Sequence, residues 1–118
     1  MINTQTFRIL NECSSTCFYC ADACLDEPSG MAECIRNCKV CGDICSLVSK
    51  ILSTSFSNVK PLVAYCKTIC EACADECEKH DHDHCDLCAK ACRACASACE
   101  DYLQGNLATI KESPGESE

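Results

Sequence analysis

The amino-acid sequence contains the same ladder of four cysteines four times, and each ladder has spacings of 4, 3 and 4 residues. Such a repeat constrains the architecture more than any local motif does. The first and third ladders begin 53 residues apart and the second and fourth 54, which predicts a duplicated helical hairpin. The ladder cysteines are Cys13, Cys17, Cys20, Cys24, Cys34, Cys38, Cys41, Cys45, Cys66, Cys70, Cys73, Cys77, Cys88, Cys92, Cys95 and Cys99.

Positions i, i+4, i+7 and i+11 lie on one face of an α-helix, and no β-strand alternation fits them. At about 100° per residue, the four thiols of a ladder form a stripe about 60° wide and some 16 Å long. Polar residues such as Asp22, Arg36 and Glu71 fall on the opposite side. Each ladder therefore predicts an amphipathic helix whose inward face is a row of sulfur atoms.

Turn-forming segments separate the predicted helices at residues 27–30, 53–58 and 80–84. Asn58 is the predicted N-cap of the third helix, with Pro61 in the first turn, where its missing N–H costs no helical hydrogen bond. Short loops between helices of equal length predict antiparallel neighbours. The fold class is therefore all-α, an antiparallel up-down-up-down four-helix bundle with a Cys-lined core.

The domain organisation follows from the repeat. A single bundle is predicted over residues 1–107, with hairpins at about 3–53 and 58–107, and residues 108–118 are predicted to be a disordered acidic tail. No apolar run approaches the roughly 18 residues that a membrane span requires, and no signal peptide is visible at the N-terminus. We therefore expect a cytoplasmic protein, in which dense cysteine indicates metal or redox chemistry rather than structural disulfides.

Composition excludes several partners and activities. A formal net charge of -8 disfavours nucleic acid and anionic membrane surfaces, because both are bound mainly through Lys and Arg. No phosphate-binding loop or nucleophile elbow occurs, so we expect no enzymatic activity. The odd count of 17 cysteines means that at least one thiol cannot pair within the chain.

The cysteines are best explained as metal ligands. Burial as a small apolar residue explains one or two cysteines, but not 17 at a fixed spacing. Disulfides within one helix are excluded, because Cβ atoms one turn apart are separated by about 5–6 Å and a bridge needs about 3.5–4.5 Å.

Three kinds of metal chemistry remain to be compared. Zinc uses four ligands per ion, and ferredoxin-type iron–sulfur runs end in Cys-Pro, which is absent here. Cu(I) prefers soft thiolates, needs only two or three of them, and is monovalent, so 17 ions would neutralise 17 thiolates. We therefore expect Cu(I) binding, with roughly 15–20 ions per chain. A Zn/Cd-buffering protein and an iron–sulfur or thiol redox protein of ferredoxin type stay open as alternatives.

The two ends of the predicted bundle differ in chemistry. One end gathers the first and third loops, which carry Met31, His80, His82, His84 and the remaining cysteine, Cys85. We hypothesise that Cu(I) enters at this end. The other end gathers apolar residues, namely Ile9, Leu10, Val48, Leu52, Val59, Leu62, Val63, Tyr102 and Leu103. Phe18, Tyr19 and Leu25 point away from the thiol row, which indicates either a subunit contact or packing on a neighbouring helix.

The four C-xxx-C-xx-C-xxx-C helices and the segment from Cys77 through the three histidines to Cys85 resemble the cytosolic bacterial copper storage proteins. The resemblance covers residues 10 to 103. It implies a four-helix bundle, a homotetramer, and Cu(I) bound by the ladder cysteines and Cys85. It also implies that His80, His82 and His84 lie at an open mouth. Only Met31 occurs in the first loop, so a methionine-rich mouth, as in exported relatives, is not implied.

Overall fold

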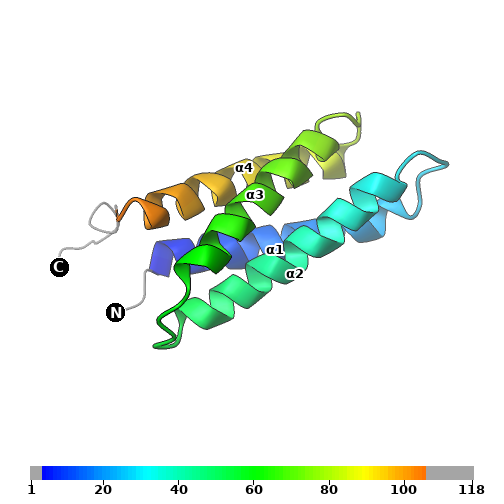
Figure 1. The fold of residues 1–118 in the computed structure, drawn as a ribbon. Coiled ribbons are helices and arrows are strands. Elements are labelled where there is room, and N and C mark those ends of the chain that lie inside the picture. Colours follow the sequence, from blue (N-terminus) through cyan, green and yellow to red (C-terminus); the bar gives the residue numbers. More distant parts are fainter. Residues whose placement is uncertain (1–3, 106–118) are drawn as a thin grey trace.

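The computed structural model describes residues 4–105, and in that range four α-helices are joined by short loops (Figure 1). The helices are α1 (Thr4–Cys24), α2 (Ala32–Leu52), α3 (Lys60–Cys77) and α4 (Asp83–Leu103). Each helix packs against its neighbours in the chain, and α4 closes the ring against α1. The predicted up-down-up-down bundle is confirmed. The proposed tail, residues 108–118, lies outside the described residues.

Sulfur fills the interior of the bundle. All 17 cysteines are at most 1% exposed, because the four ladder faces converge on one axis. Small residues between the rows let the helices approach closely, and Ala74 is completely buried. The largest fully buried aliphatic side chains, Leu10, Val48 and Val63, come from the residues predicted to gather at the apolar end.

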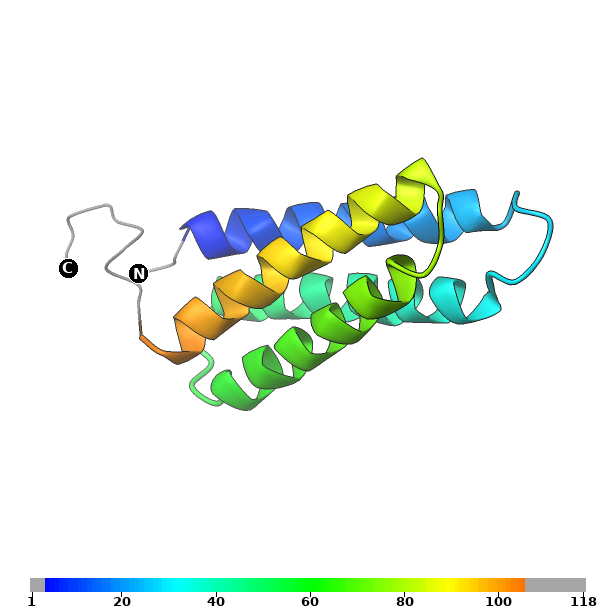
Figure 2. The ribbon, with the colours of Figure 1, turned by 90° about the horizontal axis from the view of Figure 1, so that it is seen from above.

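The two ends of the bundle carry different loops. Two perpendicular views show the α1–α2 and α3–α4 loops at one end and the α2–α3 loop at the other (Figures 1 and 2). In the first loop Gly30 has φ of +79°, a left-handed conformation that other residues rarely adopt. The predicted grouping of the first and third loops at one end of the bundle is therefore confirmed.

Two predicted helix starts need correction. The N-cap of α3 is Val59, not Asn58, although Pro61 does lie in the first turn as predicted. Val59 is buried at the apolar end, and its carbonyl accepts a hydrogen bond of 3.0 Å from the Val63 N–H, so apolar packing sets this helix start rather than a side-chain cap. The other correction concerns the histidine loop, because α4 begins at Asp83 and includes His84 in its first turn.

Hydrogen bonds from two buried serines join α1 and α2. The Ser14 hydroxyl donates to the Gly42 carbonyl at 2.9 Å, and the Ser49 hydroxyl donates to Asn11 at 2.8 Å. The Phe18 ring covers Gly42 so closely that a Cβ there would come within 2.9 Å of it. Phe18 therefore packs on α2, although 43% of it stays exposed. No helix within residues 4–105 is long and apolar enough to cross a membrane.

Candidate metal centre

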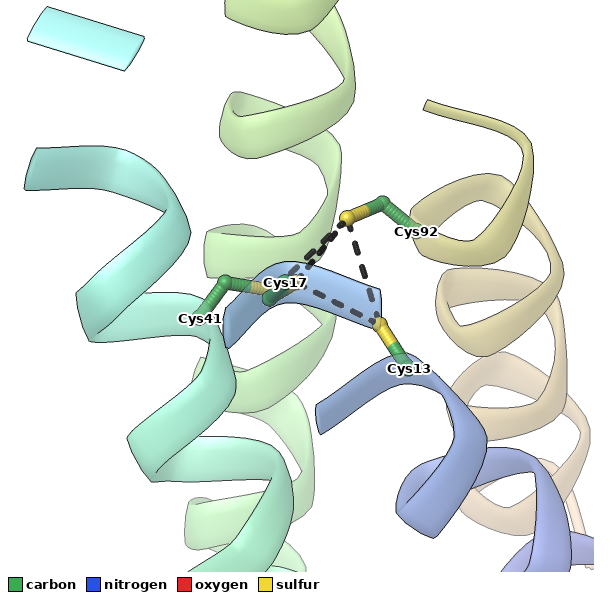
Figure 3. Close-up of side chains that lie close together, drawn as sticks. All are labelled: Cys13, Cys17, Cys41 and Cys92. Atoms are coloured by element: carbon green, nitrogen blue, oxygen red, sulfur yellow. Dashed lines mark hydrogen bonds between the residues drawn. The ribbon is translucent and has the colours of Figure 1, made fainter. Parts of the chain in front are cut away.

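The centre of the bundle brings thiols from three helices together. The Sγ atom of Cys92 on α4 lies 3.7 Å from Cys17 and 3.9 Å from Cys13, both on α1, and 3.8 Å from Cys41 on α2 (Figure 3). Their side chains point toward one another from three helices, with Cys13 and Cys17 one turn apart on α1. The thiols of one helix therefore lie next to thiols of the neighbouring helices.

Similar groups follow one another along the axis. Within each of the following groups, the sulfur atoms lie within 4.8 Å of one another. The groups are Cys13, Cys17, Cys41 and Cys92; Cys13, Cys45, Cys70 and Cys95; Cys17, Cys73, Cys88 and Cys92; Cys20, Cys38, Cys77 and Cys88; and Cys20, Cys24, Cys34 and Cys85. The groups share members: Cys13 belongs to the first two, Cys17 and Cys92 to the first and third, Cys88 to the third and fourth, and Cys20 to the last two. The thiols therefore form a connected network rather than separate four-ligand sites.

The thiols nearest the apolar end of the bundle also belong to this network. Cys45 lies 3.8 Å from Cys66 and 3.7 Å from Cys95, which joins α2 to α3 and α4. Cys99 is fully buried on the same face of α4, one turn beyond Cys95. Every predicted thiol ligand thus lies inside the bundle.

The sulfur separations match what shared metal ions require. A metal–thiolate bond is about 2.3 Å long, so three sulfurs around one ion would stand about 4.0 Å apart. Neighbouring thiols on different helices lie from 3.6 Å (Cys45 and Cys70) to 3.9 Å apart (Cys73 and Cys38). Soft ions that accept two or three sulfurs fit such a network, and they could bridge from one group to the next.

Burial keeps two of the thiols at this end, Cys24 and Cys85, protonated in the metal-free protein. It raises the pKa of Cys24 to about 11 and that of Cys85 to about 12, because the thiolate form is poorly solvated there. The thiolate is the form that binds metal, so each ion that enters must displace protons. Metal uptake is therefore coupled to proton release.

The metal-free bundle should lose stability at alkaline pH. The raised pKa values of Cys24 and Cys85 mean that the folded chain holds these protons more tightly than the unfolded chain. Their contribution is complete below an ordinary thiol pKa of about 9 and is lost as the pH rises through about 11–12. Urea unfolding at pH values of about 8 and 10.5 should give a lower midpoint at the higher pH. An unchanged midpoint would contradict this account.

The histidines at the mouth fall into two sets. The His80 imidazole and the Glu76 carboxylate, one turn apart, form a hydrogen bond of 3.0 Å, which lowers the pKa of Glu76. His82 and His84 instead stack on each other, with ring centroids 5.3 Å apart and planes 4° from parallel. The structure therefore does not bring all three predicted histidines to one point.

Sequence reasoning missed one residue at this end. The Glu27 carboxylate of the α1–α2 loop lies 3.6 Å from Nδ1 of His82 and 3.7 Å from Nε2 of His84. No motif links Glu27 to these histidines, and only the meeting of the two loops brings them together. Met31, which the sequence places at this end, is buried at 5% exposure.

Comparison with known proteins agrees with this geometry. The family model described as copper storage protein matches residues 3–104. The cysteine-rich protein YhjQ of Bacillus subtilis (strain 168) is 46% identical over 82 residues, which is 68% of this chain and 76% of that protein.

The similar solved structures include copper-bound proteins. A cytosolic copper storage protein from Streptomyces lividans with five coppers has a TM-score of 0.84 and 37% identity, over 87% of this chain and 92% of that chain. The Cu(I)-bound copper storage protein BsCsp3 has a TM-score of 0.81 and 40% identity, over 86% of this chain and 97% of that chain. The likeness therefore extends over nearly the whole bundle.

Proposed function

This chain belongs to the copper storage protein family, and on that premise we propose that it binds and stores many Cu(I) ions inside its four-helix bundle. The main support for this function is the connected network of buried thiols. Their thiolates are soft ligands, and each thiolate charge balances the charge of one monovalent ion. Relatives with the same bundle are loaded with copper.

The proposed Cu(I) ligands are the 17 cysteines, with the three histidines as ligands at the mouth. They are Cys13, Cys17, Cys20, Cys24, Cys34, Cys38, Cys41, Cys45, Cys66, Cys70, Cys73, Cys77, Cys85, Cys88, Cys92, Cys95, Cys99, His80, His82 and His84. Complete burial of the thiols and Sγ separations of 3.6–4.0 Å support this assignment. We expect the chain to bind roughly one Cu(I) ion per thiolate.

The alternative metals fit less well. The first alternative is a Zn(II) or Cd(II) buffer. Where neighbouring groups share a thiolate, a divalent ion would have too few thiolates to balance its second charge. An unbalanced charge is costly in a buried site. An iron–sulfur protein would use separate four-cysteine sets, whereas these groups share members. The copper-bound relatives also favour Cu(I).

We further propose that the protein works in the cytoplasm as a homotetramer and acts by binding rather than by catalysis. A cytosolic relative from Streptomyces lividans supports the location. Exposed apolar side chains, which include Tyr19, Leu25 and Leu87, offer surface for subunit contacts. Sedimentation of the purified chain would test the tetramer.

Counting the ions tests the storage function. The reduced chain would be titrated anaerobically with Cu(I) against a competing chelator. Retention close to the 17 thiols is expected. About four tightly held ions, or an iron–sulfur chromophore in the isolated protein, would contradict Cu(I) storage.

Replacing all three mouth histidines should change copper kinetics more than capacity. In a variant with His80, His82 and His84 changed to Ala, we expect slower Cu(I) loading or removal and nearly unchanged capacity, because the thiol network is intact. Stopped-flow loading and chelator removal would measure both. Lys90→Ala, on the exposed side of α4, is the control. A loss of capacity as large as the change in rate would contradict entry at this end.

A further inference from the structure

Some thiols of the buried network form closed triangles, in which each sulfur lies within 4.0 Å of the other two. Cys41 and Cys45 stand one turn apart on α2, and Cys70 on α3 completes their triangle. The Sγ atom of Cys41 lies 4.0 Å from that of Cys45 and 3.7 Å from that of Cys70, and Cys45 and Cys70 are 3.6 Å apart. Two helices therefore hold three sulfurs together in the metal-free chain.

Two further triangles lie between α1 and α4. Cys92 lies 3.9 Å from Cys13 and 3.7 Å from Cys17, and these two are 4.0 Å apart (Figure 3). Cys88 forms the other triangle, since it lies 3.8 Å from Cys17 and 4.0 Å from Cys92. Because both triangles use Cys17 and Cys92, they offer one site between them. The triangle that contains Cys70 offers a second site, and it shares no sulfur with the first.

Charge distinguishes the ions that a single triangle suits. Three thiolates carry three negative charges, so one triangle balances a trivalent ion by itself. A divalent ion would leave one negative charge unbalanced, and Cu(I) would leave two. An unbalanced charge is costly in a buried site, and all of these thiols are at most 1% exposed. Cu(I) therefore needs thiolates that are shared along the network, whereas a trivalent ion is neutral within one triangle.

The size of the triangles also suits a pyramidal three-coordinate centre. With thiolate bonds of about 2.3 Å, bond angles near 100° place three sulfurs roughly 3.5 Å apart, and a planar centre places them about 4.0 Å apart. The sides of the triangles run from 3.6 Å to 4.0 Å. Small movements of the side chains would therefore accommodate either geometry.

From these triangles we propose that the metal-free chain also binds trivalent arsenic, a soft pyramidal centre, taken up as arsenous acid. In each triangle three S–H bonds and three As–OH bonds break, three As–S bonds form, and three water molecules leave. Sulfur and arsenic keep their oxidation states, so no oxidant or reductant is needed. Arsenous acid is uncharged, so its entry into the buried interior brings no unpaired charge. This function goes beyond Cu(I) storage and uses the same thiols, so copper and arsenic exclude each other.

The test uses the reduced, metal-free full chain, titrated anaerobically with sodium arsenite against glutathione as the competing thiol. Native mass spectrometry counts the arsenic bound and the water lost. Cys70→Ala/Cys92→Ala removes one sulfur from every triangle described above. Cys85→Ala/Cys99→Ala is the matched control, because it also removes two buried thiols but leaves these triangles complete. Helical circular dichroism checks that each variant is folded, and the single variants Cys70→Ala and Cys92→Ala replace the double variant if it is not.

We expect wild type and the control to bind two arsenic atoms most tightly, each with the loss of three waters. In Cys70→Ala/Cys92→Ala the affinity for these two should fall at least about a hundredfold, because each site loses one of its linked attachments. Each single variant should weaken one of the two. Equal affinities in the two double variants, or loss of only two waters per arsenic, would overturn the proposal. No copper is present in this titration, so its outcome is independent of whether the chain stores Cu(I).

Discussion

Cu(I) loading should raise the unfolding temperature of the bundle by more than about 20 °C. A ligand that binds only the folded chain adds about 4 kcal/mol at a thousandfold excess over its dissociation constant. In a domain of about 100 residues each kcal/mol shifts the midpoint by about 4–8 °C. Because the thiol groups connect three helices, as at Cys92, most ions would bind only when the bundle is formed. Thermal unfolding followed by circular dichroism under anaerobic conditions would measure the shift.

Removal of the copper supplies the control for this experiment. A chelator that strips the ions should return the midpoint to that of the metal-free chain. We also expect the metal-free chain to be helical, since unfilled thiols still pack as small apolar groups. A shift of only a few degrees at full loading would show that the ions do not bridge the helices.

Truncation of Leu10 should be the most damaging single change at the apolar end. Leu10 is completely buried and is among the largest side chains in a core composed mostly of cysteine. A buried Leu→Ala change costs about 2–5 kcal/mol, because the cavity it leaves is only partly refilled. We expect Leu10→Ala to lower the unfolding midpoint of the metal-free chain by at least about 10 °C.

Leu47→Ala is the matched control, since Leu47 is 45% exposed on α2. Its cost should stay within about 0.5 kcal/mol. Loading with Cu(I) should recover most of the stability lost in Leu10→Ala, because the change removes no thiol. Equal effects of the two substitutions would contradict the assignment of this end as the packed apolar core.

Much of the fold could be predicted because one repeated spacing determines the phase of every helix. Four ladders define four inward faces, and the short loops leave few ways to join them. The start of α3 was wrong by one residue, since Asn58 has the better capping side chain but burial of Val59 determines the boundary. The capping preference of Asn58 was thus outweighed by the packing of Val59 in the folded bundle, which cannot be read from the local sequence.

The candidate site could be predicted only in part. The inward direction of the thiols follows from the ladder spacing, but their partners depend on how far each helix is shifted along its neighbour. The contact of Cys92 with Cys41, 51 positions earlier in the chain, arises from that shift. Glu27 was missed for the same reason, because its proximity to His82 and His84 exists only where two distant loops meet.

The most direct measurement of the central claim is anomalous diffraction at the copper absorption edge from crystals of the loaded chain. The account predicts copper peaks in succession along the bundle axis, each bonded to two or three cysteine sulfurs from groups such as Cys13, Cys17, Cys41 and Cys92. Their number should approach the 17 thiols. Copper confined to the mouth histidines and surface carboxylates, or about four isolated tetrahedral sites, would contradict it.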